Sequence, residues 1–159
     1  MVTPVYDTQQ IHRLLEVVSD PEIPVLSVND LGIIRDIQIN GHQVEVVITP
    51  TYSGCPAMDM IAENIQSYLH SCGYNEVKVT TVLSPAWTTD WMTETGKRKL
   101  ETYGIAPPNR ITRDSDAPKR CPRCGSTDTR VISQFGSTAC KALYQCNECM
   151  EPFDYFKCH

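Results

Sequence analysis

The sequence predicts an α+β protein in two parts. A small α/β sandwich with the element order α-β-β-α-β-α comes first, and a short cysteine-rich β module follows. Two observations support this division. Over the first hundred positions, stretches with the helical hydrophobic period alternate with stretches of the strand period, which is typical of helices packed on a sheet. Six of the eight cysteines of the 159-residue chain lie in the last 39 positions. We therefore predict a domain over residues 1–104, a linker over 105–120 and a second domain over 121–159.

The first predicted element is a helix that begins at Asp7 or Thr8, either of which can cap it. It should end near Ser19, because Pro21 disfavours helical backbone at the residue before it. The apolar residues with helical spacing in between are Ile11, Leu14, Leu15 and Val18.

A β-hairpin is predicted next. Residues 31–39 and 44–48 are two runs rich in β-branched residues, and Asn40-Gly41 follows the first of them. Asn-Gly between two such runs is a strong hairpin signal, because both residues tolerate the positive φ of a type I′ turn. We therefore expect Asn40 and Gly41 to be the two central turn residues.

A second helix should begin around Pro56 and stop at Gly73, a residue that suits a helix C-terminus. Its predicted buried stripe consists of Met58, Ile61, Ile65, Tyr68, Leu69 and Cys72.

A third strand is predicted over residues 77–83, and a last helix over 88–103, with Trp87 or Trp91 packed back on the domain. The strands should form a mixed sheet that contains the hairpin and is covered by helices. Residues 105–120 lack periodicity and are rich in proline, which indicates a linker.

The charge distribution excludes some classes of function. Residues 1–104 carry 13 acids and 6 bases, a formal charge of -7, whereas residues 105–159 carry 6 acids and 8 bases, a formal charge of +2. Four thiolates on a divalent metal would bring the second part near neutrality, so we predict no nucleic-acid partner. No apolar run is long enough to span a membrane and no export signal is visible, so we predict no membrane partner and a cytoplasmic location.

The four cysteines of two Cys-x-x-Cys pairs predict a metal centre. Cys121 and Cys124 form the first pair, and Cys146 and Cys149 the second. A two-residue gap lets a tight turn direct two thiolates at one ion, and turn amides can donate to the sulfurs. Two such turns joined by a hairpin form the closed tetrahedral site of a zinc ribbon. We predict one structural zinc here, and iron in a rubredoxin-like site has the same ligand set.

Several residues of the second part have alternative interpretations. Cys140 and Cys158 are alternative ligands, a redox pair or buried packing groups. The expected ribbon strands are 131–135 and 142–145. Three aromatic residues near the C-terminus either bury against a partner or pack the module's own core: Phe153, Tyr155 and Phe156. The histidines at positions 12, 42 and 70 have no ligand-like spacing and are expected at the surface.

Cys55 is the second informative cysteine. It directly precedes Pro56 at the predicted helix start, where free amides and the helix dipole would lower the pKa of its thiol. Asp20, Glu22 and Asp30 are acids on predicted loops that could converge on the same end of the sheet. The alternative is that Cys55 and these acids are only helix caps or solvated groups.

Four motifs of the first part resemble the MIP18 (DUF59) domain family over roughly residues 8–104. They are Asp20-Pro21-Glu22, Asp30-Leu31-Gly32-Ile33-Ile34, Thr51 with Gly54-Cys55-Pro56, and Ser84-Pro85-Ala86-Trp87-Thr88. The resemblance implies a MIP18-like fold and a role in iron–sulfur cluster assembly or delivery. It implies that Cys55 is the functional thiol, where iron or a cluster binds transiently, and that Asp20 and Glu22 belong to the acidic motif of the family. It leaves open a homodimer through this domain.

The C-terminal part resembles the D-subunit family of the phenylacetyl-CoA epoxidase system. The resemblance rests on the run that begins Cys121-Pro-Arg-Cys124, on Ser133 to Tyr144, and on Glu151 to Phe156. It implies an accessory maturation factor in aerobic phenylacetate breakdown, with the [2Fe–2S] reductase or the di-iron oxygenase as client. The alternative is a structural adaptor or a direct non-catalytic component. No nucleotide fingerprint, carboxylate–histidine motif or catalytic residue is found, so we predict that this chain does not itself perform the epoxidation.

Overall fold

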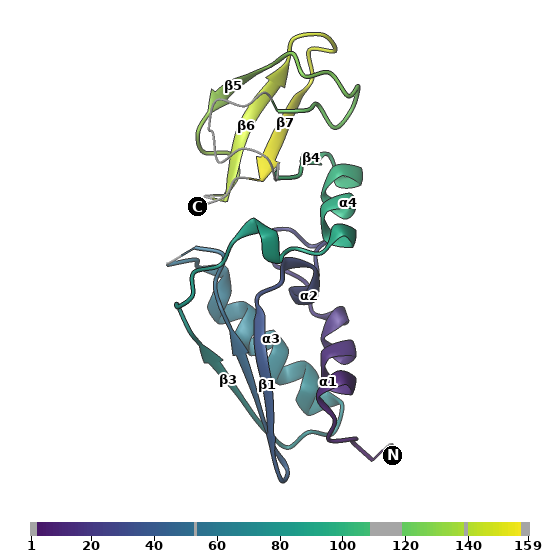
Figure 1. The fold of residues 1–159 in the computed structure, drawn as a ribbon, viewed down its shortest axis with the longest axis vertical. Helices are drawn as coiled ribbons and strands as arrows, with labels where there is room; N and C mark the ends of the chain where they lie inside the picture. Colours follow the sequence, from purple (N-terminus) through teal and green to yellow (C-terminus); the bar gives the residue numbers. More distant parts are fainter. Residues whose placement is uncertain (1–2, 53, 109–118, 139, 157–159) are drawn as a thin grey trace. The chain divides into compact units, whose positions relative to one another are not determined.

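The chain forms two compact units in the computed structural model, which describes residues 3–52, 54–108, 119–138 and 140–156. The first unit comprises Met1–Trp87 and Trp91–Thr93, and the second comprises Thr88–Asp90 and Glu94–His159 (Figure 1). The α+β class predicted from the sequence is confirmed. In the described part of the chain, no helix combines the length and hydropathy of a membrane span.

The first unit has the predicted order of helices and strands as far as the third strand, with one short helix added, whereas the last predicted helix falls in the second unit. A three-residue 3₁₀ segment, Leu15–Val17, continues the first helix, which Asp7 caps by accepting from the Gln9 amide. The main elements are α1 (Thr8–Leu14), α2 (Val28–Leu31), β1 (Ile34–Asn40), β2 (Gln43–Ile48), α3 (Ala57–Ser71) and β3 (Glu76–Thr81). Strand β1 pairs antiparallel with β2, and β2 pairs parallel with β3, so the mixed sheet is also confirmed.

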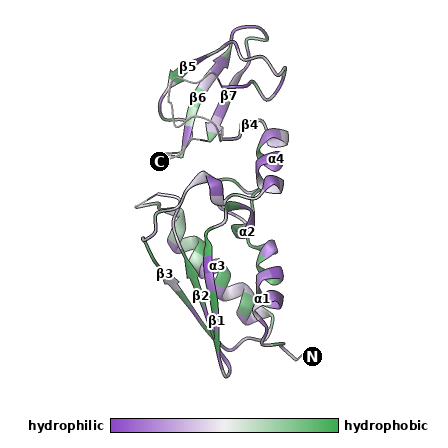
Figure 2. Cartoon of the chain, viewed as in Figure 1, coloured by the Kyte–Doolittle hydropathy of each residue, from purple (hydrophilic) through white to green (hydrophobic). Residues whose placement is uncertain are grey.

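The core of the first unit lies between α3 and the sheet (Figure 1). Strand β2 buries Val44, Val46 and Ile48 completely, because alternate residues of a strand face the same side. The buried stripe of α3 is Ala57, Met58, Ile61, Ile65 and Leu69. Tyr68 and Cys72 are only half-buried, so the predicted stripe was too wide toward the C-terminal end. Hydropathy follows this arrangement, with a largely hydrophobic β2, a β1 of mixed hydropathy and a largely hydrophilic helix in the second unit (Figure 2).

The hairpin between β1 and β2 forms with a different turn from the one predicted. Asn40 pairs with Gln43 as the last rung of the ladder, so Gly41 and His42 are the two turn residues. Gly41 has φ of 63°, whereas neither Asn40 nor His42 has a positive φ. Positive φ at the first central residue only is the pattern of a type II′ turn, in which glycine is required at that position.

Helix α2 was not predicted, and its four residues are too few for a periodic signal. It begins at Ser27, which accepts from the Asp30 amide, while the Asp30 carboxylate accepts from the Ser27 amide at 3.1 Å. This reciprocal arrangement is a capping box. It ends at Gly32, whose φ of 68° is left-handed. Asp30 therefore lies in a short helix and not on a loop.

Both tryptophans pack on the first unit. The indole Nε1 of Trp87 donates to the Leu31 carbonyl at 2.8 Å, and the Arg35 guanidinium lies 3.7 Å from the ring centre of Trp91. The predicted helix over 88–103 is interrupted. A 3₁₀ turn, Thr89–Trp91, precedes α4 (Glu94–Tyr103), and the Thr93 amide between them donates to the Asp30 carbonyl.

Replacing Gly32 by alanine should destabilise the first unit by about 3 kcal/mol. An added Cβ would collide with the carbonyl oxygen of Trp91, and the positive φ adds backbone strain. The matched control is Gly54→Ala, which also has a positive φ, +79°, but no atom within 4 Å of the added Cβ, and should cost about 1 kcal/mol. Urea unfolding followed by tryptophan fluorescence measures both, since Trp87 and Trp91 lie in the first unit. An equal loss of unfolding free energy in both variants would contradict the close approach of Gly32 to the Trp91 carbonyl.

The second unit is a four-stranded sheet with α4 at its start. Its strands are β4 (Ile105–Ala106), β5 (Thr129–Ser133), β6 (Lys141–Cys146) and β7 (Pro152–Phe156), in the spatial order β4-β7-β6-β5. Strands β5 and β6 were predicted. Strand β4 lies inside the predicted linker 105–120. Its two residues, Ile105 and Ala106, are buried and pair in parallel with β7, so this part of the linker belongs to the sheet of the second unit. The remainder of that predicted linker, residues 109–118, lies outside the described residues.

Candidate functional site

The four predicted ligands of the second unit meet at one point. The sulfurs of Cys121, Cys124, Cys146 and Cys149 all lie within 4.8 Å of one another. Cys121 Sγ is 3.7 Å from Cys149 Sγ, and Cys124 Sγ is 3.5 Å from Cys146 Sγ. A tetrahedron with Zn–S bonds of ~2.3 Å has S···S edges of ~3.8 Å. The sulfur geometry therefore fits one tetrahedral metal ion.

Two equivalent turns present these sulfurs. In the first turn the Cys121 amide donates to the Ser126 carbonyl, five residues on, and in the second the Cys146 amide donates to the Glu151 carbonyl, also five residues on. The fourth residue after the leading cysteine has positive φ in each turn: Gly125 at 79° and Met150 at 63°. Among the described residues other than glycine, Met150 alone has a positive φ.

Backbone amides donate to the sulfurs, as the spacing predicts. The amides of Cys149 and Glu148 lower the pKa of Cys146 to about 7, against the opposing effect of its burial. Each second cysteine accepts from the amide two residues later, Cys124 from Ser126 and Cys149 from Glu151. Despite that amide, burial and the neighbouring thiols raise the pKa of Cys149 to about 12. Without a cation, four thiolates at this separation would repel one another, so some of the thiols stay protonated. A divalent cation stabilises all four thiolates together.

The metal site rests on a small apolar core. Ala106, Cys121, Cys146, Phe153 and Tyr155 form one buried cluster, and the ring of Tyr144 stacks on Phe153 at 5.9 Å. Phe153, Tyr155 and Phe156 are at most 9% exposed. The alternative that these three aromatics bury against a partner is therefore wrong, since Phe153 and Tyr155 belong to the core of their own unit and Phe156 is also buried within the chain.

Of the other cysteines of this unit, the structure describes Cys140, which is not part of the cluster. Cys140 is buried, with its sulfur 3.0 Å from the Thr138 hydroxyl, which favours the packing alternative. Cys158 lies outside the described residues. The side chains of His12, His42 and His70 in the first unit are exposed, as predicted.

Cys55 lies in the loop between β2 and α3. The Cys55 amide donates to the Tyr52 carbonyl at 3.3 Å, and Gly54 has φ of 79°. An i to i+3 bond with a positive φ at the third residue is typical of a type II turn, in which glycine is favoured at that position. The Met58 amide then donates to the Cys55 carbonyl at 3.3 Å, and Pro56 occupies the cap of α3. The predicted position of Cys55 at the start of this helix is confirmed.

The pKa of the Cys55 thiol differs from the prediction. Burial raises it above the ordinary value, and the carboxylates of Glu22 and Asp20 raise it further. The Ala57 amide and the Tyr52 hydroxyl, which donate to the sulfur, act in the opposite direction but do not prevail. The prediction of a lowered pKa was wrong. It considered the stabilisation of the thiolate by the amides at the helix start, but not the loss of solvent around a side chain that is only partly exposed.

The three predicted acids have different surroundings. Asp20 and Glu22 act electrostatically on Cys55. Asp20 is buried, and its Oδ1 accepts from the amides of Glu22 at 2.7 Å and Ile23 at 2.8 Å. Asp30 is also buried, and its carboxylate accepts from the Ser27 amide and from the Thr93 hydroxyl, at 3.2 Å for the latter. The structure therefore places the charges of Asp20 and Glu22 within electrostatic range of the thiol, a grouping that is not one of the described side-chain sets able to hold a metal, and it gives Asp30 a capping role.

Tyr52 belongs to this site but was not predicted from the sequence. Its hydroxyl bonds to the Cys55 sulfur, and no pattern in the sequence indicates that contact. Tyr52 lies three residues before Cys55, and the turn between them brings its side chain to the sulfur.

Alkylation of Cys55 should be slow at neutral pH and increase only above the pH at which ordinary thiols ionise. The reason is that its pKa is raised, so little thiolate is present at neutral pH. Glu22→Gln removes a charge that raises the pKa, so it should speed alkylation under mildly alkaline conditions. Asp36→Asn is the matched control, because that carboxylate is exposed and accepts from Ile37 and Gln38. Isotope-labelled iodoacetamide with peptide mass spectrometry measures the rate at Cys55, and equal rates in both variants would contradict the grouping.

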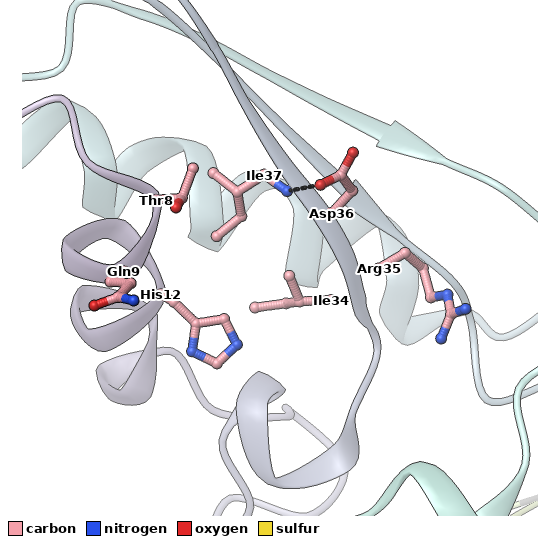
Figure 3. A pocket seen from close by; sticks show the side chains of 7 residues that line it. All are labelled: Thr8, Gln9, His12, Ile34, Arg35, Asp36 and Ile37. Atoms are coloured by element: carbon pink, nitrogen blue, oxygen red, sulfur yellow. Dashed lines mark hydrogen bonds between the residues drawn. The ribbon is translucent and has the colours of Figure 1, made fainter.

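A shallow pocket of about 390 Å³ lies elsewhere in the first unit, between α1 and β1 (Figure 3). The seven lining residues are Thr8, Gln9, His12, Ile34, Arg35, Asp36 and Ile37. None of the predicted site residues lines it, so the Cys55 site is not part of this pocket.

Two family models match the chain. Residues 8–82 match the model described as an iron–sulfur cluster assembly protein, and residues 105–157 match the PaaD zinc beta ribbon domain. The first match includes Cys55, Asp20 and Glu22, and the second includes the four clustered cysteines.

Relatives and solved structures agree with these matches. An Escherichia coli K12 protein named as the D subunit of 1,2-phenylacetyl-CoA epoxidase is 49% identical over 151 residues, which are 94% of this chain and 92% of that protein. An Fe–S protein maturation auxiliary factor of Porphyromonas gingivalis is 37% identical and matches 58% of this chain and 89% of its own length.

The solved structures cover the first part of the chain. A DUF59 domain from Bacillus anthracis has a TM-score of 0.55 and 26% identity, over 58% of this chain and 90% of that domain. A conserved protein of Thermotoga maritima has a TM-score of 0.53 and 30% identity, over 63% of this chain and 98% of that one. The MIP18-like fold that the resemblance implied is confirmed.

Proposed function

Because the chain belongs to the D-subunit family of 1,2-phenylacetyl-CoA epoxidases, we propose that it is an accessory maturation factor of that enzyme system. In this proposal Cys55 transiently holds iron or an iron–sulfur cluster and passes it to the reductase or to the di-iron oxygenase, in the cytoplasm. The chain itself does not perform the epoxidation. Its four-cysteine ribbon holds one structural zinc.

The observation that carries the proposal is the grouping of the Cys55 thiol with two carboxylates. Asp20 and Glu22 oppose ionisation of the thiol, which is unfavourable for a nucleophile or a redox thiol. A bound cation reverses this effect, because its positive charge stabilises the thiolate and the carboxylates together. Thiolate and carboxylate are both ligands of iron. The electrostatics of the Cys55 loop therefore favour a metal ion over an electrophilic substrate.

The small number of ligands at Cys55 suits transfer rather than storage. Among the described residues, the four ribbon cysteines are the one group of three or more side chains that could hold a metal. Cys55 offers one sulfur, so part of the coordination shell of an ion held there must come from the client or from solvent. A partly supplied shell lowers affinity and leaves open positions for exchange.

The ribbon has the opposite properties. It supplies four sulfurs with the spacing of a closed tetrahedron, supported by amide donors. Closed four-coordinate sites of this kind are structural, because no position is left for a substrate. Zinc is the proposed ion, and element analysis of the purified protein distinguishes it from iron.

The proposal is tested by reconstitution of the epoxidase from metal-free components. Reductase and oxygenase are prepared in the apo form, supplied with ferrous iron and sulfide, and incubated with or without this chain. The expected result is faster recovery of iron content and of the cluster absorbance in one component. Components that are already metallated should turn over at full rate without this chain. If mature components still require it, with no change in iron content, it is a working structural component and the maturation role is wrong.

A further inference from the structure

The four sulfurs of the metal centre differ in their access to solvent. Cys146 is completely buried and Cys121 nearly so, whereas Cys149 is half-buried and Cys124 is exposed. A metal ion keeps all four as thiolates, so their ionisation does not distinguish them. Oxidation of cysteine depends on thiolate character and on exposure. Cys124 is therefore the sulfur of this centre that a small oxidant in solution reaches first.

The two turns of the centre, otherwise equivalent in their backbone, differ beside the second cysteine of each pair. Cys124 is followed by Gly125, which adds no side chain, whereas Cys149 is followed by Met150. Both following residues have a positive φ, so the difference is one of side chains. The first turn leaves its second cysteine exposed, and the second turn does so only in part.

A buried thiolate lies next to the exposed one. Cys124 Sγ is 3.5 Å from Cys146 Sγ, and a disulfide bond is about 2.05 Å long. Because Cys146 is completely buried, an oxidant in solution does not reach it directly. It is nevertheless in place to react with a group that forms on Cys124. The pair thus combines one accessible sulfur with one neighbour that can resolve its oxidised form.

We propose that a peroxide oxidises Cys124, and that Cys146 then forms a disulfide with it and the zinc is released. The Cys124 thiolate attacks one peroxide oxygen, the O–O bond breaks and hydroxide leaves, so that Cys124 becomes a sulfenic acid. The Cys146 thiolate attacks the Cys124 sulfur, the S–O bond breaks and a second hydroxide leaves. The two sulfurs lose two electrons, which reduce the peroxide, and solvent protonates both hydroxides to water.

The disulfide removes two of the four sulfur ligands of the centre. Cys121 and Cys149 remain as thiolates, and two sulfurs do not complete the closed tetrahedral shell of a structural zinc. Metal binding and folding are coupled in small modules of this kind, so the second unit should unfold with the loss of the ion. Thiols reduce disulfides, so the change is reversible. The ribbon is thus a peroxide-sensitive switch, an inference that rests on the zinc proposed for the ribbon and not on iron transfer at Cys55.

Peroxide treatment of the intact, zinc-loaded protein tests the switch. A zinc-binding dye measures the release of the ion, and mass spectrometry of peptides without reduction identifies the disulfide. The expected result is the release of about one zinc per chain, with Cys124–Cys146 as the first disulfide. Dithiothreitol and added zinc should restore the original metal content. Zinc that stays bound, a first disulfide between other cysteines, or a loss that dithiothreitol does not reverse would each overturn the inference.

Cys124→His tests the role of the exposed sulfur. Histidine replaces one cysteine in many structural zinc sites but forms no disulfide. The variant should therefore hold zinc and release it to peroxide at least about tenfold more slowly than the unaltered protein. Cys140→Ser is the matched control, because Cys140 is buried in the same unit but outside the cluster, and it should release zinc at the unaltered rate.

Two further results would contradict the switch. One is equal zinc release from zinc-loaded Cys124→His and the unaltered protein, and the other is resistance to peroxide in Cys140→Ser. If Cys124→His binds no metal, the disulfide identified in the unaltered protein still decides the inference. Unaltered protein that is purified without zinc would overturn the zinc assignment together with the switch, whereas zinc that survives peroxide overturns the switch alone.

Discussion

Replacing Cys146 by serine is expected to release the metal and unfold the second unit, while the first unit stays folded. Cys146 is completely buried at the centre of the sulfur cluster, and a serine hydroxyl is a poor ligand for a soft, thiolate-bound ion. Binding of structural zinc to ribbon-like modules is worth about 10–16 kcal/mol. That exceeds the stability that a sheet of this size can obtain from its core alone. The loss of fold should therefore be complete and not partial.

Two measurements check this result. Mass spectrometric element analysis gives the metal per chain, about one zinc in the unaltered protein and none in the variant. Tryptophan fluorescence reports on the first unit, which contains both tryptophans. Cys140→Ser is the matched control, because Cys140 is buried in the same unit but outside the cluster. Full metal occupancy in the Cys146 variant would rule out the four-sulfur site, and one iron per chain would show that the ribbon holds iron.

Replacing Cys55 by serine is expected to abolish epoxidase maturation without unfolding either unit. The side chain is half-exposed and at the end of a turn that the backbone of Tyr52 closes, so its removal costs little stability. It is also the one sulfur that the proposed transfer uses. In cells that lack the native protein, the variant should support less than about a tenth of the growth rate on phenylacetate, and the iron content of the client should fall in parallel.

Cys72→Ser is the control for this experiment. Cys72 is likewise half-buried, but it follows α3 at the opposite end of that helix. Its replacement should leave growth and client iron unchanged. Full complementation by the Cys55 variant would favour the adaptor function, in which the thiol is only a packing group.

The parts of the fold that depend on a periodic pattern could be predicted from the sequence. Helix α3 has five buried residues at helical spacing, and every second residue of β2 is a buried apolar one. The metal site could also be predicted from a local pattern, since each Cys-x-x-Cys pair directs its two sulfurs at one ion. In each case the information lies within a few neighbouring residues.

The features that were missed depend on long-range contacts or on counterbalancing forces. Strand β4 has two residues, and it is a strand only because β7 lies beside it. The turn at Gly41 is set by the register of the whole hairpin, which local dipeptide preference does not determine. The direction of the pKa shift at Cys55 depends on burial and on carboxylates more than thirty residues earlier in the chain.

The two equivalent turns of the metal centre have a consequence for how the ribbon is assembled. Each turn closes through its own short hydrogen-bonded loop, so each can capture an ion with two sulfurs before the other arrives. The β5–β6 hairpin then acts as a tether that sets the effective concentration of the second pair. Loop length affects such a tether weakly, since doubling it costs about 0.6 kcal/mol. The affinity of the metal centre should therefore depend far more on the two turns than on the length of the connection between β5 and β6.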